Sequence, residues 1–330
     1  MTPTVTDWVR QAQNSRIKVD SRQTRLSRQW LPSVRAELLE RAQAVRRSVD
    51  GEFAKTASSA GQKQMAAYGE TAPHLYPIGY CHWITDCALP RLEADPLVQR
   101  LRQAGLAWRK VYFILQGRGF QNAIQCGDWL LDVAENALDL RDAPVDLSPL
   151  DSFEWENLDG WPRYAEIAEI YYGARLYPNL YFPLAFPLAP FLAIRSNGRI
   201  DLLYQQDNLF FLDLAENWRR ARQLLTDSRW LDRRLPADYE RLLEKQCGQN
   251  DIRVFPLEYR KSTPADLSRT IDEWRQAATL PPEQLKATVN AFRQVTQIAS
   301  EKLRQADLRP DAGRLKALQE SGEVPGGLGG

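Results

Sequence analysis

Three short segments separated by glycine turns constrain the fold of this chain most strongly. Residues 111–115 are rich in strand-forming side chains, and Gly117-Arg118-Gly119 follows them as a turn. Residues 120–125 continue the pattern, Gly127-Asp128 turns again, and residues 129–133 close the set. β-Branched and aromatic side chains between glycine turns are typical of strands joined in hairpins. The region therefore predicts a three-stranded antiparallel meander.

A second set of the same kind begins at residue 191. Residues 191–194, 199–204 and 209–212 are strand candidates separated by turns, and a helix is expected to begin at about Asp213. With a constant offset of 81 residues, which pairs Asp132 with Asp213, eight of twenty aligned positions are identical. This agreement predicts an internal duplication.

The predicted duplication comprises residues 111–136 and 191–217, and it places Leu131 and Leu212 at equivalent strand positions. The side-chain alternation of the two middle strands is out of phase by one residue, and such a slip reverses the faces of a strand. Chance similarity between amphipathic strands is therefore the alternative.

The regions around these sets read as helices, so we expect an α+β fold with a central antiparallel sheet. Residues 1–70 form an N-terminal helical region, in which the best-defined helix covers residues 32–49. Residues 71–260 form the core and begin with an irregular segment, 71–92, that is rich in proline. Helix starts at Thr263 and Pro281 predict a C-terminal helical hairpin over residues 261–320, followed by a flexible glycine-rich tail, 321–330.

Composition limits the setting in which the protein works. The net charge is +1, so no overall field attracts nucleic acid or an anionic membrane. Residues 180–194 are the most apolar run, but prolines interrupt it and it is too short to span a bilayer. Residues 1–20 lack an apolar signal core, and four cysteines in 330 residues make no disulfide framework. We expect a cytoplasmic protein, with export without a classical signal as the alternative.

The histidine count limits the possible chemistry, because His74 and His82 are the only two. With Cys81 and Cys87 they fall within residues 74–87, which makes Cys81 a candidate nucleophile and a histidine its candidate base. Neighbouring residues of an extended segment face opposite ways, so His74 suits this role better than His82. The spacing of these side chains does not match the paired ligands of a zinc site, so no metal is expected.

Two carboxylate pairs, Asp132 with Glu135 and Asp213 with Glu216, follow the matched strands. A helix cap and capping box explain Asp213 and Glu216, whereas acid–base chemistry or a divalent cation is the alternative for both pairs. No phosphate-binding or dinucleotide-binding glycine motif occurs, so no cofactor is expected.

The favoured function is that of an intracellular, non-catalytic protein that binds a macromolecular partner. The absence of catalytic motifs and the two helical flanks favour this interpretation, and the partner we expect is another protein. Residues 1–50 carry ten Arg or Lys and five Asp or Glu, so nucleic acid is a weaker candidate partner. The alternative function is a cysteine-dependent hydrolase or transferase with its site at residues 74–87.

Overall fold

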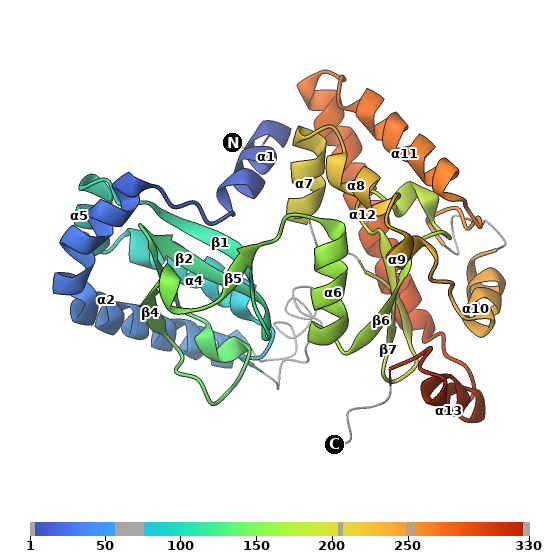
Figure 1. The fold of residues 1–330 in the computed structure, drawn as a ribbon, viewed down its shortest axis with the longest axis horizontal. Helices are drawn as coiled ribbons and strands as arrows, with labels where there is room; N and C mark the ends of the chain where they lie inside the picture. The colour runs from blue at the N-terminus through green and yellow to red at the C-terminus, as the bar shows by residue number, and fades with distance from the viewer. Residues whose placement is uncertain (1–3, 57–75, 204–206, 249–250, 252–254, 326–330) are drawn as a thin grey trace. The chain divides into compact units, whose positions relative to one another are not determined.

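The computed structural model describes residues 4–56, 76–203, 207–248, 251 and 255–325 (Figure 1). These residues form helices and two antiparallel sheets, so the predicted α+β class is confirmed. Contacts divide the chain into two units, which we describe separately. Residues 14–158 form the N-terminal unit, and residues 1–13 with 159–330 form the C-terminal unit. The division of the chain at residues 70, 260 and 320 stays a prediction.

The N-terminal unit is built on a five-stranded antiparallel sheet with the strand order β4-β3-β2-β1-β5. Its strands are β1 (Trp108–Leu115), β2 (Gly119–Cys126), β3 (Trp129–Asp132), β4 (Asp146–Pro149) and β5 (Trp155–Asn157). Its helices are α2 (Ser21–Thr56), α4 (Cys81–Glu93) and α5 (Pro96–Gln103). Strands β1, β2 and β3 follow one another as neighbours, which confirms the predicted first meander.

The two faces of this sheet pack against different parts of the unit. Successive side chains of a strand point to opposite faces, so each strand contributes to both. Ile124, Cys126 and Leu131 join a core with the apolar sides of α2 and α4. Helix α4 packs against β2, and α2 packs against α4. The other face, called the open face below, has a smaller apolar cluster of Ile17, Val111, Phe113, Leu115, Ala123, Leu130 and Leu150.

Two helix predictions in this unit need correction. The helix expected at residues 32–49 runs from Ser21 to Thr56 and includes Pro32 in its interior. An interior proline costs about 3 kcal/mol, but burial of apolar side chains on both sides of Pro32 offsets this cost. These buried side chains are Leu31, Leu38, Ala42 and Val49.

The segment expected to be irregular, 71–92, contains helix α4 from Cys81 onward. Ile84, Ala88 and Leu92 recur every fourth residue and are buried, which is the pattern of a helix packed on one side. Pro90 lies in the last turn of the helix, and it had suggested an irregular chain.

The C-terminal unit contains a three-stranded antiparallel sheet with the order β6-β7-β8. Its strands are β6 (Ala174–Pro178), β7 (Phe191–Arg195) and β8 (Ile200–Leu202). Its longer helices are α1 (Val5–Asn14), α6 (Trp161–Tyr171), α7 (Asp207–Ala215), α10 (Ala237–Cys247), α11 (Pro264–Ala277), α12 (Pro282–Ala306) and α13 (Ala312–Glu320). The short helices are α8 (Arg219–Leu224) and α9 (Ser228–Leu231). Helix α6 packs against β6, and α12 packs against β8.

The duplication in its predicted form is wrong. Residues 209–212 lie in helix α7 rather than in a strand, so Leu212 is not equivalent to Leu131 of β3. Two antiparallel three-stranded meanders do exist, but the second is β6-β7-β8 and begins before residue 191. The aligned Gly117 and Gly198 both occupy turns with positive φ, and a relation between the two meanders stays a prediction.

The C-terminal helical hairpin is confirmed, and its buried Trp274 packs among aromatic side chains. Helix α11 begins with a capping box between Thr263 and Asp266. Trp274 contacts Phe292 of α12, Phe210 of α7 and Trp218, with ring centroids 4.6, 5.5 and 6.0 Å apart. Helices therefore bury this side chain, which is 8% exposed, while the sheet contacts α12.

The predicted tail, 321–330, falls partly outside the described residues. Val324 is buried, and its backbone N–H donates to the Leu318 carbonyl at 3.1 Å, so the start of this segment is packed. Among the helices that the structure describes, none is long and apolar enough to cross a membrane.

Replacement of Trp274 with alanine tests the helical packing of the C-terminal unit. Trp274→Ala leaves a cavity among aromatic rings and should lower the free energy of unfolding by about 3–5 kcal/mol. Thermal and urea melts of the isolated protein measure this. Leu280→Ala, at an exposed position after the same helix, is the control and should change stability little. An unchanged melting temperature of Trp274→Ala would contradict the packing.

Candidate functional site

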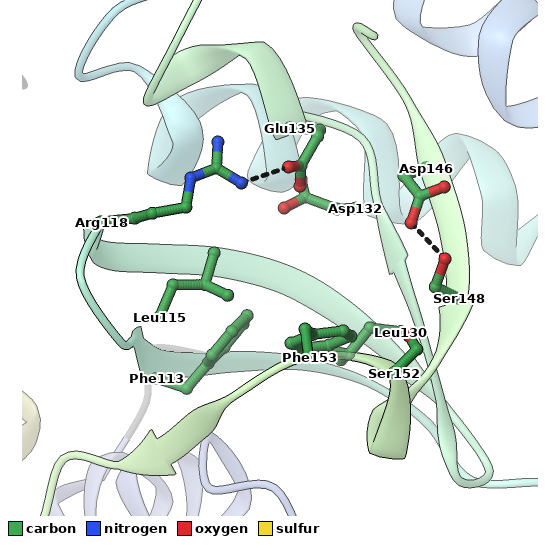
Figure 2. Close-up of a pocket in the computed structure, with 10 residues that line it drawn as sticks. All are labelled: Phe113, Leu115, Arg118, Leu130, Asp132, Glu135, Asp146, Ser148, Ser152 and Phe153. Atoms are coloured by element: carbon green, nitrogen blue, oxygen red, sulfur yellow. Dashed lines mark hydrogen bonds and ion pairs between the residues drawn. The ribbon is translucent and has the colours of Figure 1, made fainter. Parts of the chain in front are cut away.

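A pocket of about 230 Å3 lies on the open face of the sheet in the N-terminal unit (Figure 2). It is lined by Phe113, Leu115, Arg118, Leu130, Asp132, Glu135, Asp146, Ser148, Ser152 and Phe153. Apolar side chains of β1 and β3 line one part of it, whereas the carboxylates come from the end of β3, the residues after it and β4. The pocket therefore combines an apolar floor with an acidic wall.

Asp132 is the most buried acid of the pocket, at 6% exposed. Its Oδ2 accepts a hydrogen bond from Gln121 Nε2 at 2.7 Å, and its Oδ1 accepts one from the Ala134 backbone N–H at 2.7 Å. Glu135 lies beside it on the same wall of the pocket (Figure 2). Burial and then the charge of Glu135 raise the pKa of Asp132 well above its usual range, although both donors oppose this shift. Asp132 therefore holds its proton more tightly than an ordinary carboxyl group.

Asp146 stands directly opposite Asp132 in the pairing of β3 with β4. Directly opposite residues of antiparallel strands project from the same face, so both carboxylates line the pocket. Like charges at such positions destabilise a sheet. Ser148 Oγ donates to Asp146 Oδ2 at 2.6 Å, which fixes this carboxylate at the pocket edge. The strand register thus places two carboxyl groups side by side on one wall of the pocket.

Arg118 lies in the turn between β1 and β2 and provides the positive charge of the pocket lining. Its Nη1 donates to Glu135 at 2.7 Å, and its Nη2 is paired with Asp142. Figure 2 shows its guanidinium group beside Glu135, on the side away from Asp146. Arg118 therefore neutralises one end of the acidic wall, and no described residue forms an ion pair with the Asp132–Asp146 end.

Arg46 of helix α2 holds the segment that carries Glu135. It is 2% exposed, and its Nη1 donates to the Val133 carbonyl, the Asn136 Oδ1 and the Pro144 carbonyl at 2.9–3.0 Å. Its Nε is paired with Asp50 at 2.7 Å. A buried guanidinium with these partners ties both ends of the segment 133–144 to the helix, and so it positions the pocket wall.

The sequence candidates for a nucleophile lie elsewhere in the same unit. Cys81 begins α4 on the helix-covered face, is buried, and accepts a hydrogen bond from Asn122 Nδ2 at 3.5 Å. Burial raises the pKa of the Cys81 thiol, and the pKa of Cys87 is raised in the same way. A reactive cysteine needs accessible thiolate, so these features disfavour the nucleophile hypothesis. His74 lies outside the described residues.

His82 is exposed and belongs to a charged cluster between α4 and β1. Its Nε2 lies 3.1 Å from Asp86 Oδ2, and its Nδ1 lies 2.9 Å from Lys110 Nζ. Lys110 Nζ also pairs with Asp86 at 2.6 Å. Because α4 is helical, His82 and Asp86 share one face and His82 points away from the Cys81 side. Among the residues that the structure describes, neither a cysteine nor a histidine therefore lines the pocket.

The second predicted carboxylate pair has a structural role in the C-terminal unit. Asp213 was expected as the cap of its own helix, but it lies within α7 and accepts from the backbone N–H groups of Arg220 and Ala221 at 2.7 and 3.0 Å. It therefore caps α8, and burial raises its pKa to about 6. Glu216 pairs with Arg220 at 3.0 Å. These contacts correct the predicted capping box.

The N-terminal basic residues are partly used within the chain. Arg10 pairs with Asp7 at 3.1 Å, and Arg41 pairs with Glu37 and Asp95 at 2.6 and 2.7 Å. Together with the buried Arg46, these arginines are less available to bind nucleic acid.

The geometry sets limits on the chemistry of the pocket. Within the described ranges, no three His, Cys, Asp or Glu side chains come together to hold a metal ion. An acidic wall of this kind can bind a cationic group or hold and release a proton.

Comparison of the chain with protein-family models, curated proteins and solved structures found no match to any of the three.

A run of acidic residues is the feature of the sequence that indicates this site. From Asp128 to Asp159 there are ten acidic residues and only one basic residue, Arg141. Asp132 and Glu135 were considered as a carboxylate pair, but Arg118, Asp146 and Phe153 were not linked to them.

Replacement of Arg46 tests its role in holding the pocket wall. Arg46→Met leaves buried carbonyl groups without a donor and should lower the free energy of unfolding by about 3–5 kcal/mol. Urea denaturation measures this. Arg47→Met, at the neighbouring exposed position, is the control and should have little effect. Equal stability of the two variants would show that Arg46 does not support the segment.

Thiol labelling tests the hypothesis that Cys81 is a nucleophile. We expect Cys81 to react with a thiol reagent far more slowly than the half-buried Cys87, because its thiol is buried and its pKa is raised. Mass spectrometry of peptides after timed labelling at neutral pH measures both rates. A Cys81 that is labelled as fast as a free thiol would revive the nucleophile hypothesis.

Proposed function

We propose that this protein binds a macromolecular partner, another protein, and that the acidic pocket of the N-terminal unit receives a basic side chain of it. The observation that carries the proposal is the placement of Asp132 directly opposite Asp146 on the pocket wall. Both carboxyl groups would attract a bound cation, so the pocket favours a positively charged occupant.

The size and floor of the pocket favour a side chain over a free cofactor. At about 230 Å3 it is smaller than the roughly 300–1,000 Å3 of typical small-molecule sites. Phe113, Leu130 and Phe153 provide apolar surface for the methylene stem of a long basic residue. Such a residue can place its charge against the acidic wall while its backbone stays in the partner.

Other partner and function classes have less support. The acidic wall repels a nucleic-acid backbone, and several N-terminal arginines are engaged within the chain. The alternative function, a cysteine-dependent hydrolase or transferase at residues 74–87, loses support from the burial of Cys81. The binding proposal therefore remains the better one.

Peptide binding to the full chain tests the proposed function. The probes are fluorescent glycine-serine peptides with a central arginine, lysine, alanine or glutamate, measured by anisotropy at low salt. We expect the basic peptides to bind more tightly than the others. Asp146→Asn should weaken this binding about tenfold, since a charged hydrogen bond is lost.

Asp151→Asn is the matched control, because Asp151 is an exposed acid near the pocket that does not line it. Its binding should equal that of the unchanged protein. Equal binding of the arginine and glutamate peptides would contradict the proposed function. So would an Asp146→Asn variant that binds the basic peptides normally.

A further inference from the structure

The turn between β7 and β8 contains the sole Asn-Gly pair of the chain, Asn197-Gly198. Asn197 is exposed, and Gly198 has a φ of +79°, a backbone conformation that residues with a side chain rarely adopt. A Cβ atom at position 198 would also lie 2.7 Å from Leu315 Cδ1 of α13. The fold of the C-terminal unit therefore requires glycine directly after this exposed asparagine.

The turn also holds together the two groups that react when an asparagine loses its side-chain amide. Asn197 Oδ1 accepts a hydrogen bond from the Arg199 backbone N–H at 3.0 Å. This hydrogen bond closes a ring that includes the Gly198 peptide, and it draws electrons away from the side-chain carbon Cγ of Asn197. Because glycine has no side chain, the Gly198 nitrogen is not shielded from that carbon by an atom of its own residue.

We infer that Asn197 is a site of spontaneous deamidation, and that the modified turn loosens helix α13 from the C-terminal unit. The inference is independent of the proposed function. No motif of the sequence assigns a modification to this position, and the structure supplies both the reason for the reaction and its consequence.

The reaction needs water as its one co-reactant, and nothing is oxidised or reduced. The Gly198 nitrogen gives up its proton and attacks Asn197 Cγ, so a nitrogen–carbon bond forms while the bond from Cγ to Nδ2 breaks. Nδ2 takes up a proton and leaves as ammonia. Water then opens the resulting ring. Opening at Cγ leaves aspartate, whereas opening at the Asn197 backbone carbonyl carbon leaves isoaspartate, which has an extra carbon in the main chain.

Helix α13 packs directly on this turn. Leu315 lies against Gly198, and Gln319 Nε2 donates to the Ser196 carbonyl at 2.9 Å. On the α10 side, the Tyr239 hydroxyl donates to the Gly198 carbonyl at 2.7 Å. An extra main-chain carbon at position 197 shifts the carbonyl groups that accept these hydrogen bonds. Formation of isoaspartate should therefore detach α13, and the fraction of loosened chains should grow with the age of the protein.

The turn also contains the contact that limits the rate. The Gly198 backbone N–H donates to the Arg195 carbonyl at 2.8 Å, and the Arg195 N–H donates to the Arg199 carbonyl at 2.9 Å. The Gly198 nitrogen can attack only while the first of these hydrogen bonds is open. Opening of the turn and release of α13 favour one another, because coupling between two equilibria is reciprocal. A change that weakens the packing of α13 should therefore speed the deamidation of Asn197.

Timed incubation of the folded full chain in mildly alkaline buffer, followed by mass spectrometry of its peptides, tests the modification site. We expect aspartate and isoaspartate to accumulate at Asn197 several-fold faster than at Asn14, an exposed asparagine that precedes Ser15. Asn197→Gln should abolish the reaction at this position, since its longer side chain would have to close a larger ring. An Asn197 that stays intact, or that reacts no faster than Asn14, would overturn the inference.

Two further measurements test the coupling to α13. Leu315→Ala should accelerate deamidation of Asn197, whereas Lys316→Ala, at the neighbouring exposed position, should leave the rate unchanged. Limited digestion with trypsin should cut within α13, after Arg314, faster in the aged chain than in the fresh one. Aged Asn197→Gln, which experiences every other effect of incubation, should be cut like the fresh chain. Equal rates of deamidation in the two alanine variants, or equal cutting of aged and fresh chains, would overturn the coupling.

Discussion

Strand β2 is buried along its whole length, and this constraint determines much of the N-terminal unit. Both of its faces are covered, yet it carries Gln121, Asn122 and Gln125, whose polar groups need partners inside the protein. Gln121 holds Asp132 of the pocket, and Asn122 donates to Cys81 of α4. Gln125 Nε2 donates to the Lys18 carbonyl and so fixes the segment before α2. The side-chain amides of this one strand thus connect the sheet to helix α4, to the segment before α2 and to the candidate site.

The sequence predicted the fold best where local signals agreed with one another. The β1–β2–β3 meander was predicted correctly because glycine turns and strand-forming residues occur together at short spacing. Residues 209–212 were taken for a strand because four consecutive apolar residues suit either a buried strand or a buried helix. Only tertiary contacts decide between these two structures. Phe210 packs against Trp218, Trp274 and Phe292, which lie outside α7. The aligned residues 129–131 lie in strand β3, so the similarity in sequence does not correspond to equal secondary structure.

The candidate site was only partly predictable. Asp132 and Glu135 are close in sequence, so their pairing could be predicted, but the burial that raises the pKa of Asp132 depends on the folded sheet. Asp146 could not be linked to them, because its position opposite Asp132 depends on the register of β4, a four-residue strand without a clear pattern. The hypothesis at Cys81 depended on an irregular segment, and the helix that forms instead turns this thiol into the core.

The buried Arg46 has a consequence for attempts to isolate or transplant the pocket. The wall between β3 and β4 is held by hydrogen bonds to a side chain of α2, an element about ninety residues earlier in the chain. A fragment containing only the strands would keep the backbone pairing of the hairpins but lose the donor that shapes this wall. The smallest fragment that retains the pocket therefore includes α2. Grafting the acidic segment onto another sheet would require an equivalent buried guanidinium group.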